Sequence, residues 1–283
     1  MGRGAYEHNY TQLNLPELTA ETADPAPVAL AVPADLTGQG PAAVDLYCAE
    51  NRALLADQAE SWAGRFQLIY LDPPFESGTL YVHLDWHAVH YVKVELDRLF
   101  GRDRFLNEII WCYPGPSPIR SAFKRKHDTI LAYTRSRDYY FDADAVRVPY
   151  DESTVKTFAA SAKAGFDKAP DLARGKAPED WWYFPVVARI HSERVGYETQ
   201  KPEALLERII TASSRPGDLV GDFFAGSGTA GVVATRPGRD AILIDRNPVA
   251  IEKSLLRLAR LDPQPTVRLW RYFIAEEPEI SCS

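Results

Sequence analysis

Short apolar segments alternate with amphipathic segments along most of the chain from residue 44 to residue 261. The segment RFQLIYLDPPF at 65–75 is apolar almost without interruption, which is typical of a strand buried on both faces of a parallel sheet. The segment VAIEKSLLRLARL at 249–261 repeats apolar residues every three or four positions, as an amphipathic helix does. Strands that alternate with helices predict an α/β fold, with a mostly parallel sheet and helices on both of its faces.

Composition narrows the class of protein further. Of the 283 residues, 46% are hydrophobic and 25% are charged, which fits a soluble globular protein and excludes a disordered or collagen-like chain. No run of 18 apolar residues and no N-terminal secretory signal occurs, so no membrane span is expected. Cys48, Cys112 and Cys282 are odd in number and widely spaced, which argues against a metal site or a disulfide framework and for a cytoplasmic location.

Changes in composition and in hydrophobic periodicity along the chain predict five regions. They are an N-terminal arm at 1–43, a catalytic half at 44–112, an irregular insert at 113–198, a cofactor-binding half at 199–261 and a C-terminal tail at 262–283. The expected strands lie at 44–48, 65–75, 78–86, 104–113, within 123–136, at 215–224 and at 240–248. The expected helices lie at 50–64, 87–101, 201–214, 225–236 and 249–261.

One connection conflicts with a parallel sheet. Only Glu76 and Ser77 separate the expected strands at 65–75 and 78–86. Parallel neighbours need a crossover of about a dozen residues or more, whereas a two-residue link permits only a hairpin, for which Glu-Ser is poor turn chemistry. Either the strands are not parallel neighbours, or a crossover segment is missing from the chain. We favour the missing segment, which predicts a break between residues 75 and 78.

A glycine-rich turn, DFFAGSGTAG at 222–231, follows an expected strand and opens an expected helix. Gly226 and Gly228 permit a tight turn and the close approach of a ligand, and the helix N-terminus carries partial positive charge. With Gly231 they match the pattern G-x-G-x-x-G, although a turn without a ligand fits the same residues. Asp245 ends the next strand, where a carboxylate can accept hydrogen bonds from ribose hydroxyls. The pair predicts an adenosine-like ligand.

The segment Asp72-Pro73-Pro74-Phe75 ends the expected buried strand, at the edge where open α/β sheets bind ligands. The prolines stiffen the backbone and remove N–H donors while they keep the carbonyl acceptors. The Asp72 carboxylate and the Pro73 carbonyl can therefore accept the two N–H bonds of a nucleobase amino group. The ring of Phe75 can stack on that base, a contact worth about 1–3 kcal/mol. A strand merely ended by prolines is the alternative.

Seven segments, taken in order, resemble the motifs of amino DNA methyltransferases: LIYLDPPF, GTLYVHLDW, NEIIWCYP, FKRKHDTILAYT, TQKPEALLERII, GDFFAGSGTAG and ILIDRNP. Such enzymes have a Rossmann-like sheet and move a methyl group from S-adenosylmethionine to the exocyclic amine of adenine or cytosine. The catalytic motif precedes the cofactor motif, an order similar to the β class. Asp72 favours adenine N6, with cytosine N4 as the alternative. An NAD-dependent oxidoreductase is the alternative from another class, but it gives the DPPF segment no purpose.

The resemblance also implies roles for individual residues. The methionine half of the cofactor would be wrapped by Phe224, Ala225, Gly226, Ser227, Gly228 and Thr229. Asp222 would receive its amino group, Asp245 would hold the ribose, and Thr199 and Lys201 would face its carboxylate. The chain departs from the family at CAEN, 48–51, where relatives often have Gly-Asp-Asn, so Glu50 beside Asn51 would replace that Asp near the adenine.

The insert carries a basic cluster in an otherwise acidic chain of net charge −7. The cluster is Arg120, Lys124, Arg125 and Lys126 with the adjacent His127. Such a cluster can neutralise phosphates, although a solvated face is the plain alternative. The resemblance implies double-stranded DNA as the partner, with the target base flipped out of the duplex. It also allows a homodimer and a cognate restriction endonuclease that acts separately. No Pro-Cys dipeptide occurs, so the chain does not resemble the cytosine-C5 methyltransferases.

Overall fold

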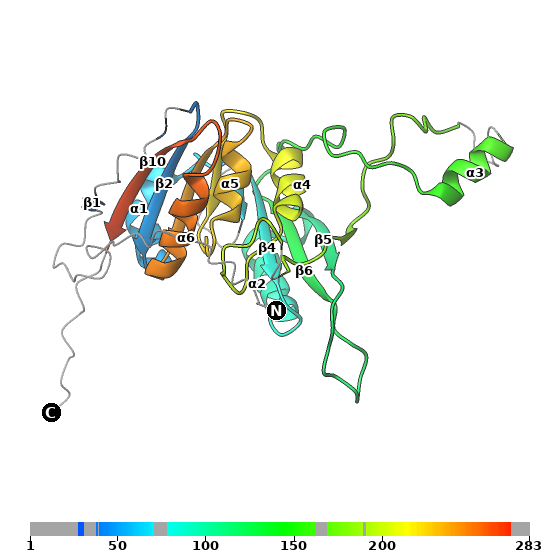
Figure 1. Cartoon of the computed structure of the whole chain (residues 1–283), viewed down its shortest axis with the longest axis horizontal. Coiled ribbons are helices and arrows are strands. Elements are labelled where there is room, and N and C mark those ends of the chain that lie inside the picture. The colour runs from blue at the N-terminus through cyan, green and yellow to red at the C-terminus, as the bar shows by residue number, and fades with distance from the viewer. Residues whose placement is uncertain are drawn as a thin grey trace, which may run out of the picture.

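The computed structural model describes residues 28–30 (backbone), 38, 40–70, 78–161, 169–188 and 191–272. Within these residues the strands are β1 (Val28–Leu30), β2 (Ala43–Ala49), β3 (Leu68–Tyr70), β4 (Thr79–Leu84), β5 (Phe105–Cys112), β6 (His127–Thr134), β7 (Trp181–Tyr183), β8 (Leu219–Asp222), β9 (Asp240–Asp245) and β10 (Thr266–Tyr272). They form one sheet in the order β1-β10-β2-β9-β8-β3-β4-β6-β5-β7. From β10 to β4 every neighbouring pair is parallel. The predicted α/β fold is confirmed (Figure 1).

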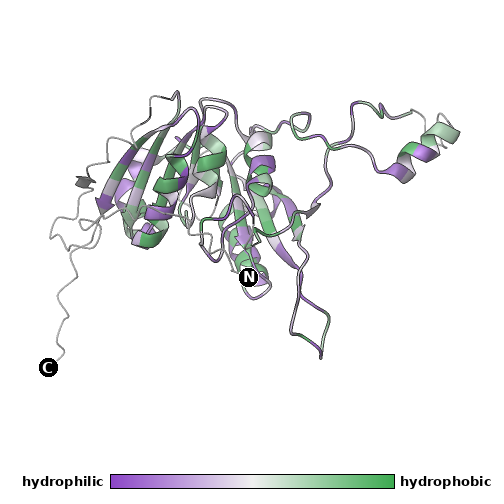
Figure 2. Cartoon of the chain, in the orientation of Figure 1, coloured by the Kyte–Doolittle hydropathy of each residue, from purple (hydrophilic) through white to green (hydrophobic). Residues whose placement is uncertain are grey.

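Helices cover both faces of the sheet. They are α1 (Asn51–Trp62), α2 (Val89–Phe100), α3 (Glu152–Ala160), α4 (Glu203–Ser213), α5 (Thr229–Thr235) and α6 (Pro248–Leu258), with a short 3-10 helix at Arg102–Arg104. Buried residues of α4, α5 and α6 form one core with the sheet, and those of α1 and α2 form a second core. Hydrophobic residues dominate the strands and the helix faces packed on them (Figure 2). None of the helices in the described residues is long and apolar enough to cross a membrane.

Side chains at the helix starts explain where two of these helices begin. The Glu50 carboxylate accepts the Ala53 N–H at 2.8 Å and caps α1. The side chain of Asn247 accepts the Val249 N–H at 3.0 Å, and Pro248 occupies the first turn of α6. Such caps satisfy backbone donors that have no partner within the helix. Both caps lie directly after strands, so they fix the chain at the carboxyl edge of the sheet.

Between β8 and β3 the chain changes the direction in which it adds strands to the sheet, although the two strands are parallel. The chain passes from β8 through α5 to β9 on one side, and from β3 to β4 on the other. Ligands of open α/β sheets bind at such a switch point, outside the carboxyl ends of the strands. Tyr70, the last residue of β3, pairs with Asp222, the last residue of β8. The ends of β3 and β8 therefore lie side by side at the carboxyl edge of the sheet.

The strands β3 and β4 are parallel neighbours, with Tyr70 paired to Tyr81. The antiparallel alternative is therefore excluded. Residues 71–77, which join the two strands, lie outside the described residues, as does the predicted break between 75 and 78. The expectation of a missing crossover segment stays a prediction.

Three strands and one α-helix were not expected from the sequence: β1, β7, β10 and α3. In β10 the buried Val267 and Leu269 alternate with polar residues, and the buried Arg271 breaks the apolar pattern. The helix α3 has no buried residue and extends away from the sheet (Figure 1). Without an apolar stripe, no periodic signal marks such a helix in the sequence.

Candidate active site

The glycine-rich turn joins β8 to α5. Gly226 and Gly228 have φ of 53° and 71°, a backbone region that favours glycine. A Cβ on Gly228 would lie 2.6 Å from Ser254 Oγ, and one on Gly231 would lie 2.6 Å from Leu243 Cδ1. The turn is therefore packed tightly against α6 and β9. This packing leaves no room for a side chain at either position.

Asp245 holds the turn in place. Its carboxylate accepts the Gly226 N–H at 2.8 Å and the Asn247 N–H at 2.9 Å. The Ala225 N–H also donates to the Ile244 carbonyl at 2.9 Å, so the turn is bonded along the end of β9. Each carboxylate oxygen has two acceptor sites. Asp245 can therefore still accept hydrogen bonds from a vicinal diol.

An open pocket of about 340 Å³ lies beside this turn. Its lining residues are Glu50, Asn51, Phe223, Phe224, Asp245 and Arg246. The Asn51 amide donates to the Phe223 carbonyl at 3.1 Å, which ties the start of α1 to the end of β8. The side chain of Phe224 is 53% exposed and offers an aromatic face. A carboxylate for a diol beside an aromatic face for a base fits an adenosine.

Asp222 lies at the floor of the site and is only 3% exposed. Burial raises the pKa of its carboxyl group to about 7, while the hydrogen bond from the Phe224 N–H lowers it and Asp245 raises it. The partly exposed Lys201 lies near enough to favour the ionised form of Asp222. Burial lowers the pKa of Lys201 itself, and Asp128 and Asp222 raise it. A cation bound beside this carboxyl group, such as an ammonium group, would favour its ionised form.

Residues from outside the turn also contact it. The Thr229 hydroxyl donates to the Lys201 carbonyl at 3.3 Å, so the Lys201 backbone lies at the turn, whereas Thr199 is exposed. That these two residues face the cofactor carboxylate stays a prediction. Two neighbours were missed. Arg257 donates to the Ser227 carbonyl and the Thr229 hydroxyl, at 3.1 and 2.8 Å. The ring of Tyr197 lies against Gly226, where an added Cβ would meet it at 3.0 Å.

A buried polar network, also missed, lies where β3, β4, β5 and β6 meet at the carboxyl edge. The Tyr70 hydroxyl lies 2.6 Å from His83 Nδ1, and His83 Nε2 lies 3.2 Å from Asp128. The Tyr113 hydroxyl donates to the other Asp128 oxygen at 3.1 Å. Burial raises the pKa of Asp128, but the bonds from His83 and Tyr113 hold it below its ordinary value.

The protonation states of this network follow from its geometry. An ionised Asp128 only accepts hydrogen bonds, so His83 donates from Nε2, and its Nδ1 accepts the Tyr70 proton. Burial lowers the pKa of His83, in keeping with a neutral ring. The network would hold the end of β3, two residues before Asp72, in one position.

The predicted catalytic residues Asp72, Pro73, Pro74 and Phe75 lie outside the described residues. The strand that precedes them ends at Tyr70, which pairs with Asp222 on one side and with Tyr81 on the other. This strand end lies between the cofactor-type pocket and the polar network, and the roles of the four residues stay a prediction.

The predicted basic cluster lies on the loop 113–126, which joins β5 to β6 (Figure 1). Because Leu84 pairs with Thr129 and Cys112 with His127, this loop leaves the same carboxyl edge. Arg120, Lys124, Arg125 and His127 are exposed, and Lys126 is partly exposed. In the rest of the insert, Arg174 is paired with Asp144, and Lys176 is paired with Glu179 at 2.5 Å. Those two cations are already paired with acidic groups.

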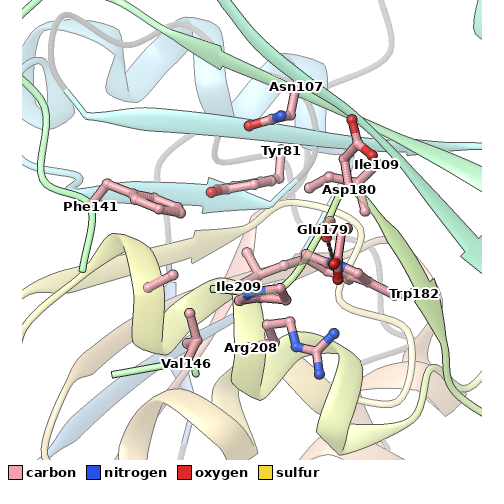
Figure 3. Close-up of a pocket in the computed structure, with 12 residues that line it drawn as sticks. Tyr81, Asn107, Ile109, Phe141, Val146, Glu179, Asp180, Trp182, Arg208 and Ile209 are labelled. Atoms are coloured by element: carbon pink, nitrogen blue, oxygen red, sulfur yellow. Dashed lines mark hydrogen bonds between the residues drawn. The ribbon is translucent and has the colours of Figure 1, made fainter. Parts of the chain in front are cut away.

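A second pocket lies between α4 and the other half of the sheet (Figure 3). Tyr81, Phe141 and Arg208 line it, and its volume is about 70 Å³. The Arg208 guanidinium lies 5.1 Å from the centre of the Trp182 ring, and the indole N–H of Trp182 donates to the Glu179 carbonyl at 2.7 Å. This pocket is much smaller than the first one and shares no lining residue with it.

The fold and the first pocket together define a Rossmann-like protein with a nucleotide-type cofactor site at its switch point. Residues 75–255 match the family model of the DNA methylases that act on N6 or N4, and the chain belongs to this family. The resemblance predicted from the motifs is thereby confirmed at the level of the family. Family membership also sets aside the oxidoreductase alternative.

Two curated relatives are similar to the chain over roughly two thirds of its length. It is 33% identical over 187 residues to the DNA adenine methyltransferase YhdJ of Escherichia coli (strain K12), covering 65% of this chain and 61% of that protein. It is 32% identical over 182 residues to the Type II methyltransferase M.HpaI of Haemophilus parainfluenzae, covering 64% of this chain and 53% of that protein. The matched part thus spans less than two thirds of the length of these relatives.

Solved structures share the fold. The complex of M1.HpyAVI with SAM superposes with a TM-score of 0.55 at 19% identity, covering 77% of this chain and 100% of that one. The cytosine-N4-specific PvuII DNA methyltransferase has a TM-score of 0.54 at 16% identity, covering 78% and 89%. A DNA modification methylase of Thermus thermophilus, described as putative and complexed with S-adenosyl-L-methionine, has a TM-score of 0.53 at 19% identity, covering 81% and 97%.

Proposed function

We propose that this chain is a DNA methyltransferase that moves a methyl group from S-adenosylmethionine to the exocyclic amine of a base flipped out of double-stranded DNA, with adenine N6 as the acceptor. One observation carries the proposal. The last residue of β3, Tyr70, lies two positions before Asp72 and is paired with Asp222 at the foot of the glycine-rich turn. The strand that leads to the Asp72 segment therefore ends beside the cofactor-type pocket, which supports the proposal.

The cofactor is assigned to this pocket by its residues. Asp245 would accept the ribose hydroxyls, and the turn 225–229 would wrap the methionine portion. Phe224, which was expected from the sequence to lie with the methionine portion, would instead border the adenine with Asn51 and Glu50, because its exposed ring lines the pocket beside them. Asp222 would pair with the methionine ammonium, which favours its ionised form, and Lys201 would face the carboxylate. Bound there, S-adenosylmethionine supplies an electrophilic methyl group on a positively charged sulfur.

The reaction requires the chain to orient a poor nucleophile. The lone pair of a base amino group is delocalised into the ring. Hydrogen bonds to the Asp72 carboxylate and the Pro73 carbonyl would draw the nitrogen toward tetrahedral geometry and aim its lone pair at the methyl group. Such alignment supplies a large part of the rate acceleration. Asp72 would also stabilise the positive charge that develops on the nitrogen.

The acceptor base is the finer part of the proposal. Asp at the first position of the segment supports adenine, and one relative of 33% identity is named an adenine methyltransferase. The PvuII enzyme, which shares the fold, is named as specific for cytosine N4. Analysis of the modified nucleosides decides between the two. A product of N4-methylcytosine would keep the mechanism and replace the acceptor.

The test of the proposal is methylation of DNA from a host that lacks base modification. The purified chain with S-adenosylmethionine should produce N6-methyladenine, measured by mass spectrometry of the digested DNA. The variant Asp72→Ala should lose this activity and still bind the cofactor in calorimetry. Asp57→Ala, on the exposed face of α1, serves as the matched control and should keep full activity. Near-normal turnover by Asp72→Ala would refute the assignment.

The proposal also covers the recognition sequence and the protein partners of the enzyme. Two relatives are named Type II methyltransferases, which supports a defined recognition sequence. A homodimer and a separate cognate restriction endonuclease are consistent with it. Sequencing of DNA from a host that expresses the chain, with detection of modified bases, would reveal the recognition site.

A further inference from the structure

The loop 113–126 carries an unusual side chain near its end. Phe123 is 99% exposed, which makes it the most exposed of the large hydrophobic side chains in the described part of the chain. A single exposed apolar residue is common on protein surfaces. At this position, however, it lies on a loop that leaves the carboxyl edge, where the candidate active site is.

The charge of the loop indicates what could cover this ring. From residue 113 to residue 127 the sequence contains Arg120, Lys124, Arg125 and Lys126 and no acidic residue, although the whole chain has a net charge of −7. An exposed aromatic ring on a loop that also carries cations suits a partner that combines negative charge with flat apolar surfaces. Duplex DNA has both, in its phosphates and its stacked bases.

The base of the loop is braced, so the position of Phe123 relative to the site is restricted. The Tyr113 N–H donates to the Lys126 carbonyl at 3.1 Å, and the Lys126 ammonium donates to the Pro116 carbonyl at 2.7 Å. The Arg125 guanidinium lies 4.0 Å from the centre of the Trp86 ring, two residues after β4. Three prolines between residues 114 and 118 further limit the backbone.

We propose that Phe123 is a wedge that enters the DNA duplex and stacks in the space vacated by the flipped target base. The inference rests on the proposed function, because extrusion of a base is needed only for chemistry on that base. Extrusion loses pairing and stacking, and an apolar side chain inserted between base steps restores part of the stacking. The cations beside Phe123 would hold the flanking phosphates. Phe123 is thus a positioning residue that acts on the duplex.

The experiment uses the full chain and duplexes that contain its own recognition site, found by sequencing of modified host DNA. The target base is placed opposite its normal partner, opposite a mismatch or opposite an abasic position. On the paired duplex, Phe123→Ala should lower kcat about tenfold or more, because no side chain then restores the stacking that is lost when the base is extruded. On the mismatched and abasic duplexes, where extrusion costs less, the loss should shrink to about twofold. Phe123→Trp should keep turnover on all three.

Matched variants separate the wedge from charge and from folding. Phe141→Ala removes another exposed phenyl ring, one that lies in the second pocket and away from the carboxyl edge, and should leave turnover unchanged. Lys124→Ala should reduce the dependence of DNA binding on salt, whereas Phe123→Ala should leave that dependence as it is.

Three results would overturn the inference. The first is a Phe123→Ala variant that methylates the paired duplex at the normal rate. The second is an equal loss on all three duplexes, which indicates a structural defect rather than a wedge. The third is loss of binding to phosphatidylserine vesicles with normal methylation, which would make the loop a membrane contact. A wild-type chain that methylates none of the duplexes would instead contradict the proposed function, and the wedge with it.

Discussion

Two buried titratable residues at the site, Asp222 and His83, have pKa shifts that affect stability in opposite ways. Burial raises the pKa of Asp222 to about 7. The native state therefore holds a proton that the unfolded state releases near its ordinary pKa of about 3.9, so stability falls as the pH rises from about 4 to 7. Burial lowers the pKa of His83, so its contribution is lost as the pH falls below about 6.5, where an unfolded histidine gains a proton.

The variant Asp222→Asn isolates the first effect. Asn keeps an acceptor for the Phe224 N–H and carries no charge. Relative to the wild type, the variant should gain up to about 4 kcal/mol of unfolding free energy at pH 7.5, and the gain should shrink toward pH 4. Urea unfolding at a series of pH values measures it. Parallel curves for the two proteins would show that Asp222 is not protonated in the native state.

At the scale of elements, two glycines with left-handed backbone lie on either side of α5 and allow a controlled comparison. Gly228 has φ of 71° and is crowded by Ser254, whereas Gly238 has φ of 82° and open space around it. Gly238→Ala should cost only the backbone strain, of the order of 1 kcal/mol. Gly228→Ala should cost about 2 kcal/mol more, because α6 must move away, and it alone should weaken cofactor binding. Thermal unfolding and calorimetry give both quantities, and equal effects at the two sites would contradict the packing argument.

Most of the helices and strands of the sheet could be predicted from the sequence. The near-continuous apolar strands β3, β4 and β9 and the striped helices α4 and α6 are readily predicted, because burial on both faces or on one stripe leaves a periodic pattern. Polar residues that interrupt these apolar patterns also indicate buried hydrogen bonds, although these were not predicted. Arg257 lies on the buried stripe of α6, and His83 interrupts an apolar strand. Each forms the buried hydrogen bonds that its position demands.

At the scale of the whole molecule, the sequence motifs predicted which strand ends meet at the candidate site but not the buried side chains beside them. The glycine-rich turn and Asp245 lie together as expected, since consecutive strands of a parallel sheet place their ends at one edge. The network from Tyr70 to Tyr113 depends on the antiparallel register of β6 between β4 and β5. No local pattern encodes that register, so residues 13 to 45 positions apart could not be paired from the sequence.

Because the pocket draws residues from α1, from β9 and from the turn after β8, a bound ligand should stabilise the whole molecule and not one element. With S-adenosylhomocysteine at about 100 times its Kd, the unfolding free energy should rise by about 2.7 kcal/mol, which corresponds to a Tm about 5–10 °C higher. NAD at the same concentration should leave the Tm unchanged, because family membership implies a methionine-bearing nucleoside rather than a dinucleotide. Asp245→Ala should abolish the shift, whereas Asp57→Ala, outside the pocket, should preserve it. Stabilisation by NAD alone would contradict the cofactor assignment even if the fold is as described.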